Sequence, residues 1–165
     1  TDENDDYKNY YIIPCDGVSN FMALNYEGKK IVLYNDFFVN LLFAKFKISD
    51  NKWSHSSILT FLAHEIGHFK YRYAYNIIDG KVTNKIKLGD EKRKLELEAD
   101  EYAGYIMAKD GNSLTELLRI FKISLNFYDK ILDLLPNKPI VKTHPPLDLR
   151  VESITKGWNK FIKTK

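Results

Sequence analysis

The apolar residues between positions 57 and 70 recur at helical spacing and form one broad stripe. It consists of Ile58, Phe61, Leu62, Ile66 and Phe69 and also takes in Glu65. The stripe predicts a largely buried helix that begins near Ser54 or Ser56 and ends near Tyr73. His64 and His68 lie at the edge of the stripe, where a core helix normally carries apolar side chains. These two polar positions therefore need a chemical explanation.

Four other segments show helical patterns with start signals, and they cover about residues 37–46, 91–109, 114–135 and 145–158. Asn35 or Asp36 can cap the first helix, Asp90 the second, and Asn112 or Ser113 the third. The last helix opens with two prolines, a residue type that fits the first helical turn. The chain is therefore expected to be mostly helical.

Short apolar runs near the N-terminus predict strands. Residues 10–13 form one such run, and residues 21–24 and 30–33 flank a turn and predict a hairpin. Residues 75–88 contain a further turn signal and indicate a mobile hairpin or loop. The predicted fold class is α+β: a mostly helical single domain with a small antiparallel sheet near the N-terminus.

The composition is ordinary for one soluble globular domain, with 165 residues of which 44% are hydrophobic and 28% charged. Residues 1–9 are expected to form an acidic flexible tail and residues 10–165 the folded domain. No apolar run approaches the ~18 residues of a membrane span, and no signal peptide opens the chain. The protein is expected to be soluble. Its compartment is not predicted, and export stays open because a processed or truncated N-terminus would look the same.

The net charge of +3 is unevenly distributed: residues 1–6 carry −4, which leaves +7 for the rest. Several lysines lie near the C-terminus at helical spacing, at positions 156, 160, 163 and 165. This spacing favours a solvated helix face, and no aromatic-basic signature of a nucleic-acid binder accompanies it. No nucleic-acid partner is therefore expected, and the oligomeric state is not predicted.

The candidate chemistry begins with the motif His64-Glu65-Ile66-Gly67-His68. Residues four apart share one face of a helix, so the two imidazoles can bind one metal ion from the same side. Glu65, between them, can then act as the general base that deprotonates a water at the open coordination position. The alternative is a buried histidine pair on an amphipathic helix without any metal.

A catalytic zinc site needs a third protein ligand, and the helix predicted from residue 91 offers candidates. Glu96 and Asp100 lie on a helical face with the small residues Ala99 and Ala103, whereas Glu98 points elsewhere. Glu96 is therefore the better ligand and Glu98 the alternative. Asp100 can accept a hydrogen bond from the far nitrogen of a ligating imidazole. One Zn²⁺ per chain is expected.

Three motifs follow one another along the chain: HEIGH at 64–68, ELEADEYAG at 96–104 and THPPLDLR at 143–150. In this order they resemble the HtpX, CaaX prenyl protease, BepA and Oma-type zinc metallopeptidases, which are gluzincins. The resemblance implies a zincin-like fold in which the HExxH helix packs on the helix that supplies the glutamate ligand. It implies that residues 10–165 are a zinc metallopeptidase catalytic domain with His64, His68 and Glu96 as ligands. Asp100 would support one of the zinc histidines, for which His64 is the candidate.

The resemblance also brings His144 close to the site, where it can stabilise the oxyanion of the reaction. It can instead contact the zinc in a resting state or serve only at the start of the last helix. Arg150 can orient the substrate, brace acidic side chains near the site, or lie at the surface.

Residues 20–23 occupy the position of a family strand that often reads Asn-Ala-Phe-Ala. They are Asn20, Phe21, Met22 and Ala23, and a substrate peptide would add beside them as a further strand. The departure from the family pattern puts substrate preference in question more than catalysis. The family's best-known members also carry membrane helices around the catalytic unit, and this chain has none.

The predicted function is that of a zinc-dependent endopeptidase that hydrolyses peptide bonds of protein substrates, with Glu65 as general base. The alternative is a non-catalytic zinc-binding or regulatory domain of the same fold. An intact Glu65 argues against that alternative, because a structural metal site needs no general base.

Overall fold

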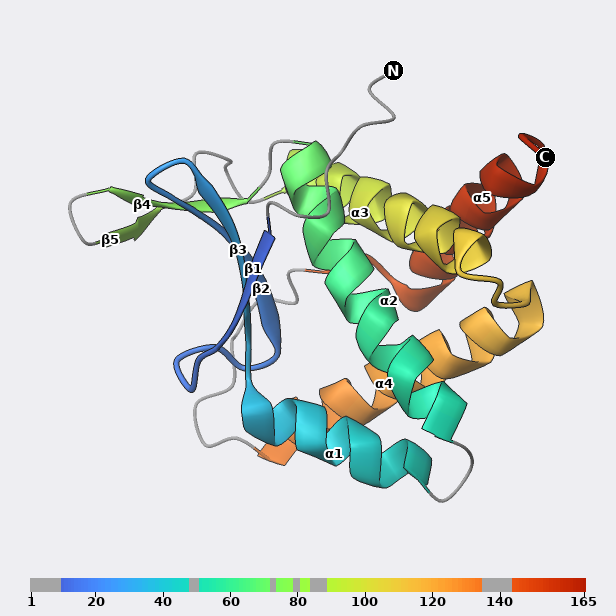
Figure 1. The fold of residues 1–165 in the computed structure, drawn as a ribbon, viewed down its shortest axis with the longest axis horizontal. Coiled ribbons are helices and arrows are strands. Elements are labelled where there is room, and N and C mark those ends of the chain that lie inside the picture. Colours follow the sequence, from blue (N-terminus) through green and yellow to red (C-terminus); the bar gives the residue numbers. More distant parts are fainter. Residues whose placement is uncertain (1–9, 48–50, 72–73, 79–80, 84–88, 135–143) are drawn as a thin grey trace.

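The computed structural model describes residues 10–47, 51–71, 74–78, 81–83, 89–134 and 144–165 (Figure 1). Its helices are α1 (Asp36–Lys47), α2 (Asn51–Lys70), α3 (Asp90–Lys109), α4 (Leu114–Leu134) and α5 (Leu147–Ile162). Its strands are β1 (Tyr10–Pro14), β2 (Phe21–Tyr26), β3 (Lys29–Tyr34), β4 (Tyr75–Ile78) and β5 (Lys81–Thr83). The predicted mostly helical fold with a small sheet is confirmed. The tail predicted at 1–9 lies outside the described residues.

The sheet is mixed, with the strand order β1-β3-β2-β4-β5, so the prediction of an antiparallel sheet was wrong in part. β2 and β3 form the predicted antiparallel hairpin, but β1 lies parallel to β3 and β4 lies parallel to β2. The chain reverses direction twice between β1 and β3, so these two strands run the same way. The two-residue turn at Glu27 and Gly28 keeps β2 and β3 adjacent, which leaves the outer edge of β3 for β1.

Residues 75–88 were expected to be a mobile hairpin or loop. The antiparallel pairing of β4 with β5 matches the hairpin, and residues 84–88 lie outside the described residues. β4 pairs with β2 only at Leu24 and Asn25, opposite Tyr75 and Asn76. The hairpin therefore extends the sheet sideways from the C-terminal half of β2 (Figure 1).

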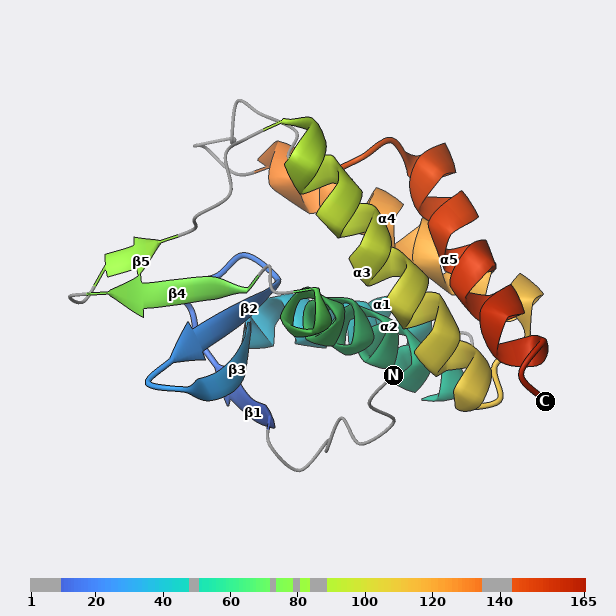
Figure 2. The ribbon, with the colours of Figure 1, turned by 90° about the horizontal axis from the view of Figure 1, so that it is seen from above.

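Helix α2 lies between the sheet on one side and α3 with α5 on the other (Figure 2). The apolar face of the sheet packs on it, and the rings of Phe21 and Phe61 stack with centroids 5.5 Å apart. Phe38 and Leu42 of α1 complete this core and are almost fully buried. The HExxH helix is thus held on both sides by other elements of the fold.

Helices α2, α3 and α5 approach each other closely through small residues. A Cβ added to Gly67 of α2 would lie 2.9 Å from the Cα of Ala99 on α3. Added to Gly104 of α3, it would clash with the backbone of Ile154, and added to Gly157 of α5, with that of Glu101. These three glycines therefore allow the helices to approach more closely than side chains would permit.

The helix starts follow the sequence signals with small corrections. Asn35 caps α1, because its Oδ1 accepts a hydrogen bond of 2.9 Å from the Phe38 amide. Ser113 caps α4: its Oγ accepts a hydrogen bond of 3.2 Å from the Glu116 amide and donates one of 2.9 Å to Glu116 Oε2. Asp90 lies inside α3, so it does not cap it as predicted. The two prolines precede α5, which begins at Leu147.

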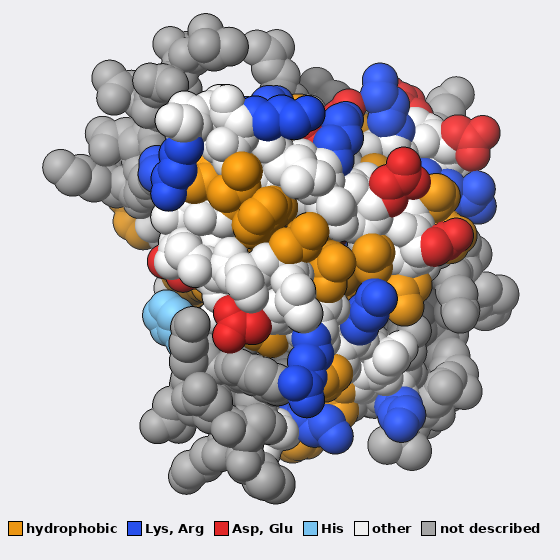
Figure 3. All heavy atoms as spheres, turned by 90° about the vertical axis from the view of Figure 1, so that its right-hand side faces the viewer, with side chains coloured by type: hydrophobic (Ala, Val, Ile, Leu, Met, Phe, Trp, Pro, Cys, Tyr) orange, Lys and Arg blue, Asp and Glu red, His pale blue; other side chains and the backbone are white. Residues whose placement is uncertain are grey.

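Lysines of α5 lie on its outer side, where Lys156 and Lys160 pair with Glu101 of α3 at 2.6 and 3.8 Å. On the face shown in Figure 3, Lys and Arg side chains are interspersed with Asp and Glu around a band of hydrophobic side chains. Across the described ranges, each helix is too short or too polar to cross a membrane.

Candidate metal centre

Helix α2 brings His64, Glu65 and His68 together in the interior. The three residues are 6%, 8% and 6% exposed. The centroids of the two imidazole rings lie 4.7 Å apart. One possible ligand atom from each of the three residues lies within 4.8 Å of the other two. The i, i+4 spacing on one helix produces this arrangement of the imidazoles.

Helix α3 contributes Glu96, whose carboxylate faces both histidines. Its Oε2 lies 3.4 Å from Nε2 of His64, and its Oε1 lies 3.9 Å from Nε2 of His68. Glu98 is elsewhere: it is partly exposed and lies 3.9 Å from Lys94 on its own helix. The close approach of α2 and α3 at Gly67 puts Glu96, and not Glu98, beside the imidazoles.

The three side chains fit a divalent cation. Glu96 Oε2 is fully buried and accepts no hydrogen bond from the part of the chain that the structure describes. A buried carboxylate oxygen without such a bond is costly, and a cation would satisfy it. Two imidazole nitrogens and a carboxylate oxygen are also the donor set of many catalytic zinc sites.

Asp100 of α3 is fully buried and joins two other elements. Its Oδ1 lies 2.8 Å from Nδ1 of His64. It also accepts two hydrogen bonds from Arg150 of α5, from Nε at 2.7 Å and from Nη2 at 2.8 Å. Burial raises the pKa of Asp100, but the opposing charge of Arg150 prevails and holds that pKa below its usual value. Asp100 therefore fixes the ring of His64 with Nε2 facing Glu96.

The buried groups have strongly altered protonation. Burial disfavours the charged form of His64, but Asp100 and Glu96 outweigh it and raise the pKa of His64 to about 10. Burial lowers the pKa of His68 to about 3. Burial also raises the pKa of Glu65 to about 7, against the charge of His64. Without metal, His64 is therefore protonated at neutral pH and His68 is neutral.

Glu65 makes its hydrogen bond with the sheet. The backbone amide of Ala23, on β2, donates to Glu65 Oε2 at 2.8 Å. No local sequence signal predicts this contact, since it depends on which amides of β2 point away from β3.

His144 and Arg150, on the segment that leads into α5 and on α5 itself, both reach the centre. Nε2 of His144 lies 3.6 Å from Glu96 Oε2, and the side chain is 41% exposed. Burial lowers the pKa of His144. Arg150 is buried against Asp100, and its guanidinium lies over the ring of Phe121. Phe121 was not among the residues predicted to lie near the site. Of the roles considered for Arg150, this geometry matches the bracing of an acidic side chain.

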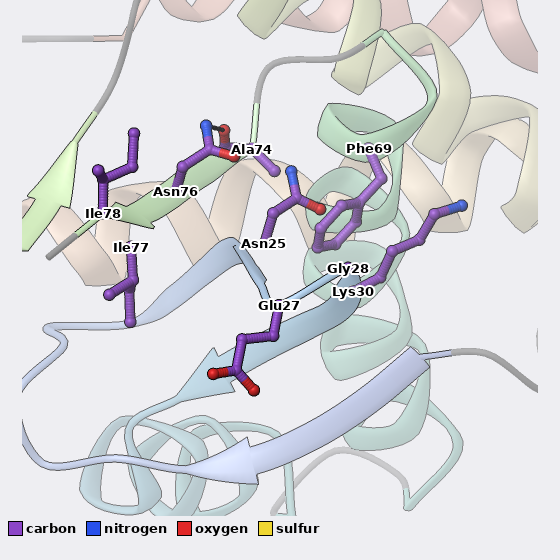
Figure 4. Close-up of a pocket in the computed structure, with 9 residues that line it drawn as sticks. All are labelled: Asn25, Glu27, Gly28, Lys30, Phe69, Ala74, Asn76, Ile77 and Ile78. Carbon is purple, nitrogen blue, oxygen red and sulfur yellow. Dashed lines mark hydrogen bonds between the residues drawn. The ribbon is translucent and has the colours of Figure 1, made fainter. Parts of the chain in front are cut away.

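A separate pocket of about 460 Å³ lies at the far end of β2, beside β4 and the end of α2 (Figure 4). It is lined by Asn25, Glu27, Gly28, Lys30, Phe69, Ala74, Asn76, Ile77 and Ile78. None of the predicted ligands lines it. Asn25 and Asn76 stand opposite each other where β2 pairs with β4, so the pocket lies at this pairing.

Two buried histidines, a buried glutamate beside them and a second carboxylate within reach are side chains that metal-dependent hydrolases use around their ion. The model of peptidase family M48 matches residues 83–157. Over this stretch, which is less than half of the chain, the protein is similar to the M48 peptidases, and two of the three motifs, at 96–104 and 143–150, lie within the match. The matched residues include Glu96, Asp100, His144 and Arg150, while the HExxH motif precedes them. Neither the curated proteins nor the solved structures gave a match.

Proposed function

We propose that the protein is a zinc-dependent endopeptidase with a zincin-like catalytic unit. The observation that carries this proposal is the convergence of His64 and His68 on the Glu96 carboxylate, with Glu65 within 4.8 Å of the imidazole nitrogens. His64, His68 and Glu96 would hold one zinc ion per chain and leave a coordination position open. When bound, the ion would polarise the scissile carbonyl and acidify water.

Glu65 would act as general base. It would take a proton from the attacking water and later return it to the leaving amine. Burial raises the pKa of Glu65 to about 7 in the metal-free protein, which favours a carboxylate that can both accept and release a proton. Its burial also keeps bulk water from competing for the proton.

His144 would donate a hydrogen bond to the oxyanion that develops on the scissile carbonyl. Its imidazole lies 3.6 Å from Glu96 and stays partly exposed toward solvent, so a substrate can reach it. Asp100 and Arg150 would act behind the ligands by holding the ring of His64 in place.

The substrate peptide would lie along the edge of β2 between Asn20 and Ala23. Among the described residues, β4 is the strand on the side of β2 away from β3, and it pairs only with Leu24 and Asn25. Phe21 has its backbone groups on the open side, where they can bind a peptide backbone without regard to sequence. Side chains near Met22 would then set the preference among substrates.

The experiment that tests this proposal is metal removal. The purified chain should contain about one zinc per molecule and cleave an unfolded protein such as casein. A chelator should abolish cleavage, and zinc added back to the stripped protein should restore it. Cleavage that continues after complete removal of metal would contradict the proposal. Zinc binding without cleavage of any unfolded protein would favour the non-catalytic alternative.

A further inference from the structure

The edge of β2 that faces the metal centre has a defined set of backbone groups. The Asn35 amide donates to the Asn20 carbonyl at 2.7 Å, so this pair faces inward between β2 and β3. Backbone groups alternate sides along an antiparallel strand. The register therefore turns the amides of Phe21, Ala23 and Asn25 away from β3.

The outward amide of Ala23 is engaged by Glu65. The hydrogen bond is 2.8 Å long and joins two residues that are only 2% and 8% exposed. Its acceptor is the side chain that lies between the two histidines of α2. A charge-assisted hydrogen bond in such a buried setting is a strong restraint on a side chain with three rotatable bonds.

The restraint has a chemical purpose. Glu65 contributes to a group of ligand atoms that lie within 4.8 Å of one another, so its carboxylate is near enough to coordinate a metal ion itself. A glutamate that ligates the ion closes the open position and cannot serve as a base. Holding one carboxylate oxygen on β2 keeps the other available for proton transfer.

We propose that the Ala23 backbone amide is a positioning group that fixes the Glu65 carboxylate, so that this point of the β2 edge holds the base and does not bind substrate. The inference rests on the proposed role of Glu65. It shortens the stretch of β2 that can bind substrate, because β4 pairs with β2 at Leu24 and Asn25 and the Ala23 amide is hydrogen-bonded to Glu65. Phe21 carries the other outward backbone groups of β2 before Leu24, and these are the ones left for a peptide.

Hydrogen exchange of single amides, measured by NMR on the whole chain, tests the contact without any activity. The Ala23 amide has no partner on β3, so its protection should fall roughly 10-fold in Glu65→Ala relative to the Met22 and Leu24 amides. Glu65→Gln, which keeps an acceptor oxygen, should retain most of this protection, and Glu98→Ala all of it. An equal change at all three amides, or none at Ala23, would overturn the inference.

Kinetics then test the positioning role. Ala23→Pro deletes the amide hydrogen, whereas Ala23→Gly removes only the methyl group. At equal zinc content and folded fraction, turnover of the Ala23→Pro enzyme should be about 10²-fold lower than that of Ala23→Gly, with a smaller difference in KM. Equal turnover of the two variants would overturn the inference. If neither the wild type nor Ala23→Gly cleaves peptides, the proposed function fails, while the exchange result still decides the Ala23 contact.

Discussion

Replacing Asp100 with alanine should damage both stability and metal binding, by different routes. Asp100 is fully buried and accepts two hydrogen bonds from Arg150, while its Oδ1 also lies 2.8 Å from Nδ1 of His64. The Asp100→Ala variant leaves the guanidinium of Arg150 buried without its carboxylate. Breaking a buried ion pair in this way costs about 3–5 kcal/mol of the free energy of unfolding.

The loss of metal affinity has another cause. Without Asp100, the ring of His64 is no longer fixed with Nε2 facing Glu96. Removal of such a partner weakens metal binding by about 10- to 100-fold. The three proposed ligands remain in place, so binding should be weakened and not abolished.

A second substitution separates the two effects. In Asp100→Ala combined with Arg150→Met, no unpaired buried cation remains, so most of the lost stability should return. The zinc affinity should stay low, because His64 still lacks its partner. Urea unfolding of the metal-free proteins measures the first quantity, and chelator competition measures the second. Unchanged zinc affinity in Asp100→Ala, or no recovery of stability in the double variant, would refute this reasoning.

Three further predictions concern the ligands and their neighbours. Glu96→Ala should strip the zinc while Glu98→Ala should leave it bound, and metal analysis showing the reverse would make Glu98 the ligand. Zinc binding at pH 7 should release about one proton from His64, whose pKa is about 10, and none from His68, whose pKa is about 3. The number of protons released should decline as the pH approaches 10. Calorimetry in buffers of different ionisation enthalpy measures this number, and binding without proton release would count against His64 as a ligand. His144→Ala should lower turnover about 10²- to 10³-fold at unchanged zinc content, whereas higher turnover would identify a resting-state zinc ligand.

Local sequence signals predicted the helices and the face of α3 on which Glu96 lies. The apolar spacing of α2 and the small residues near Ala99 are properties of single helices, so they can be read along the chain. Gly67 lies against Ala99 in the structure, at an approach that a side chain would block.

Contacts that depend on long-range register could not be predicted in this way. The pairing of β4 with β2 and the direction of β1 depend on how distant segments meet, and the short strands carry no signal of either. The bond between Ala23 and Glu65 follows from that register. Arg150 had several plausible roles in the sequence, and its partner Asp100, fifty residues earlier, emerges only from the packing of α3 on α5.

The comparison of the wild type with Glu65→Gln tests the central claim most directly. The amide has nearly the shape of the carboxylate but cannot accept a proton as a base. Both proteins should bind about one zinc with similar affinity, and only the wild type should hydrolyse casein. Hydrolysis by Glu65→Gln at the wild-type rate, with contaminating protease excluded, would contradict the account.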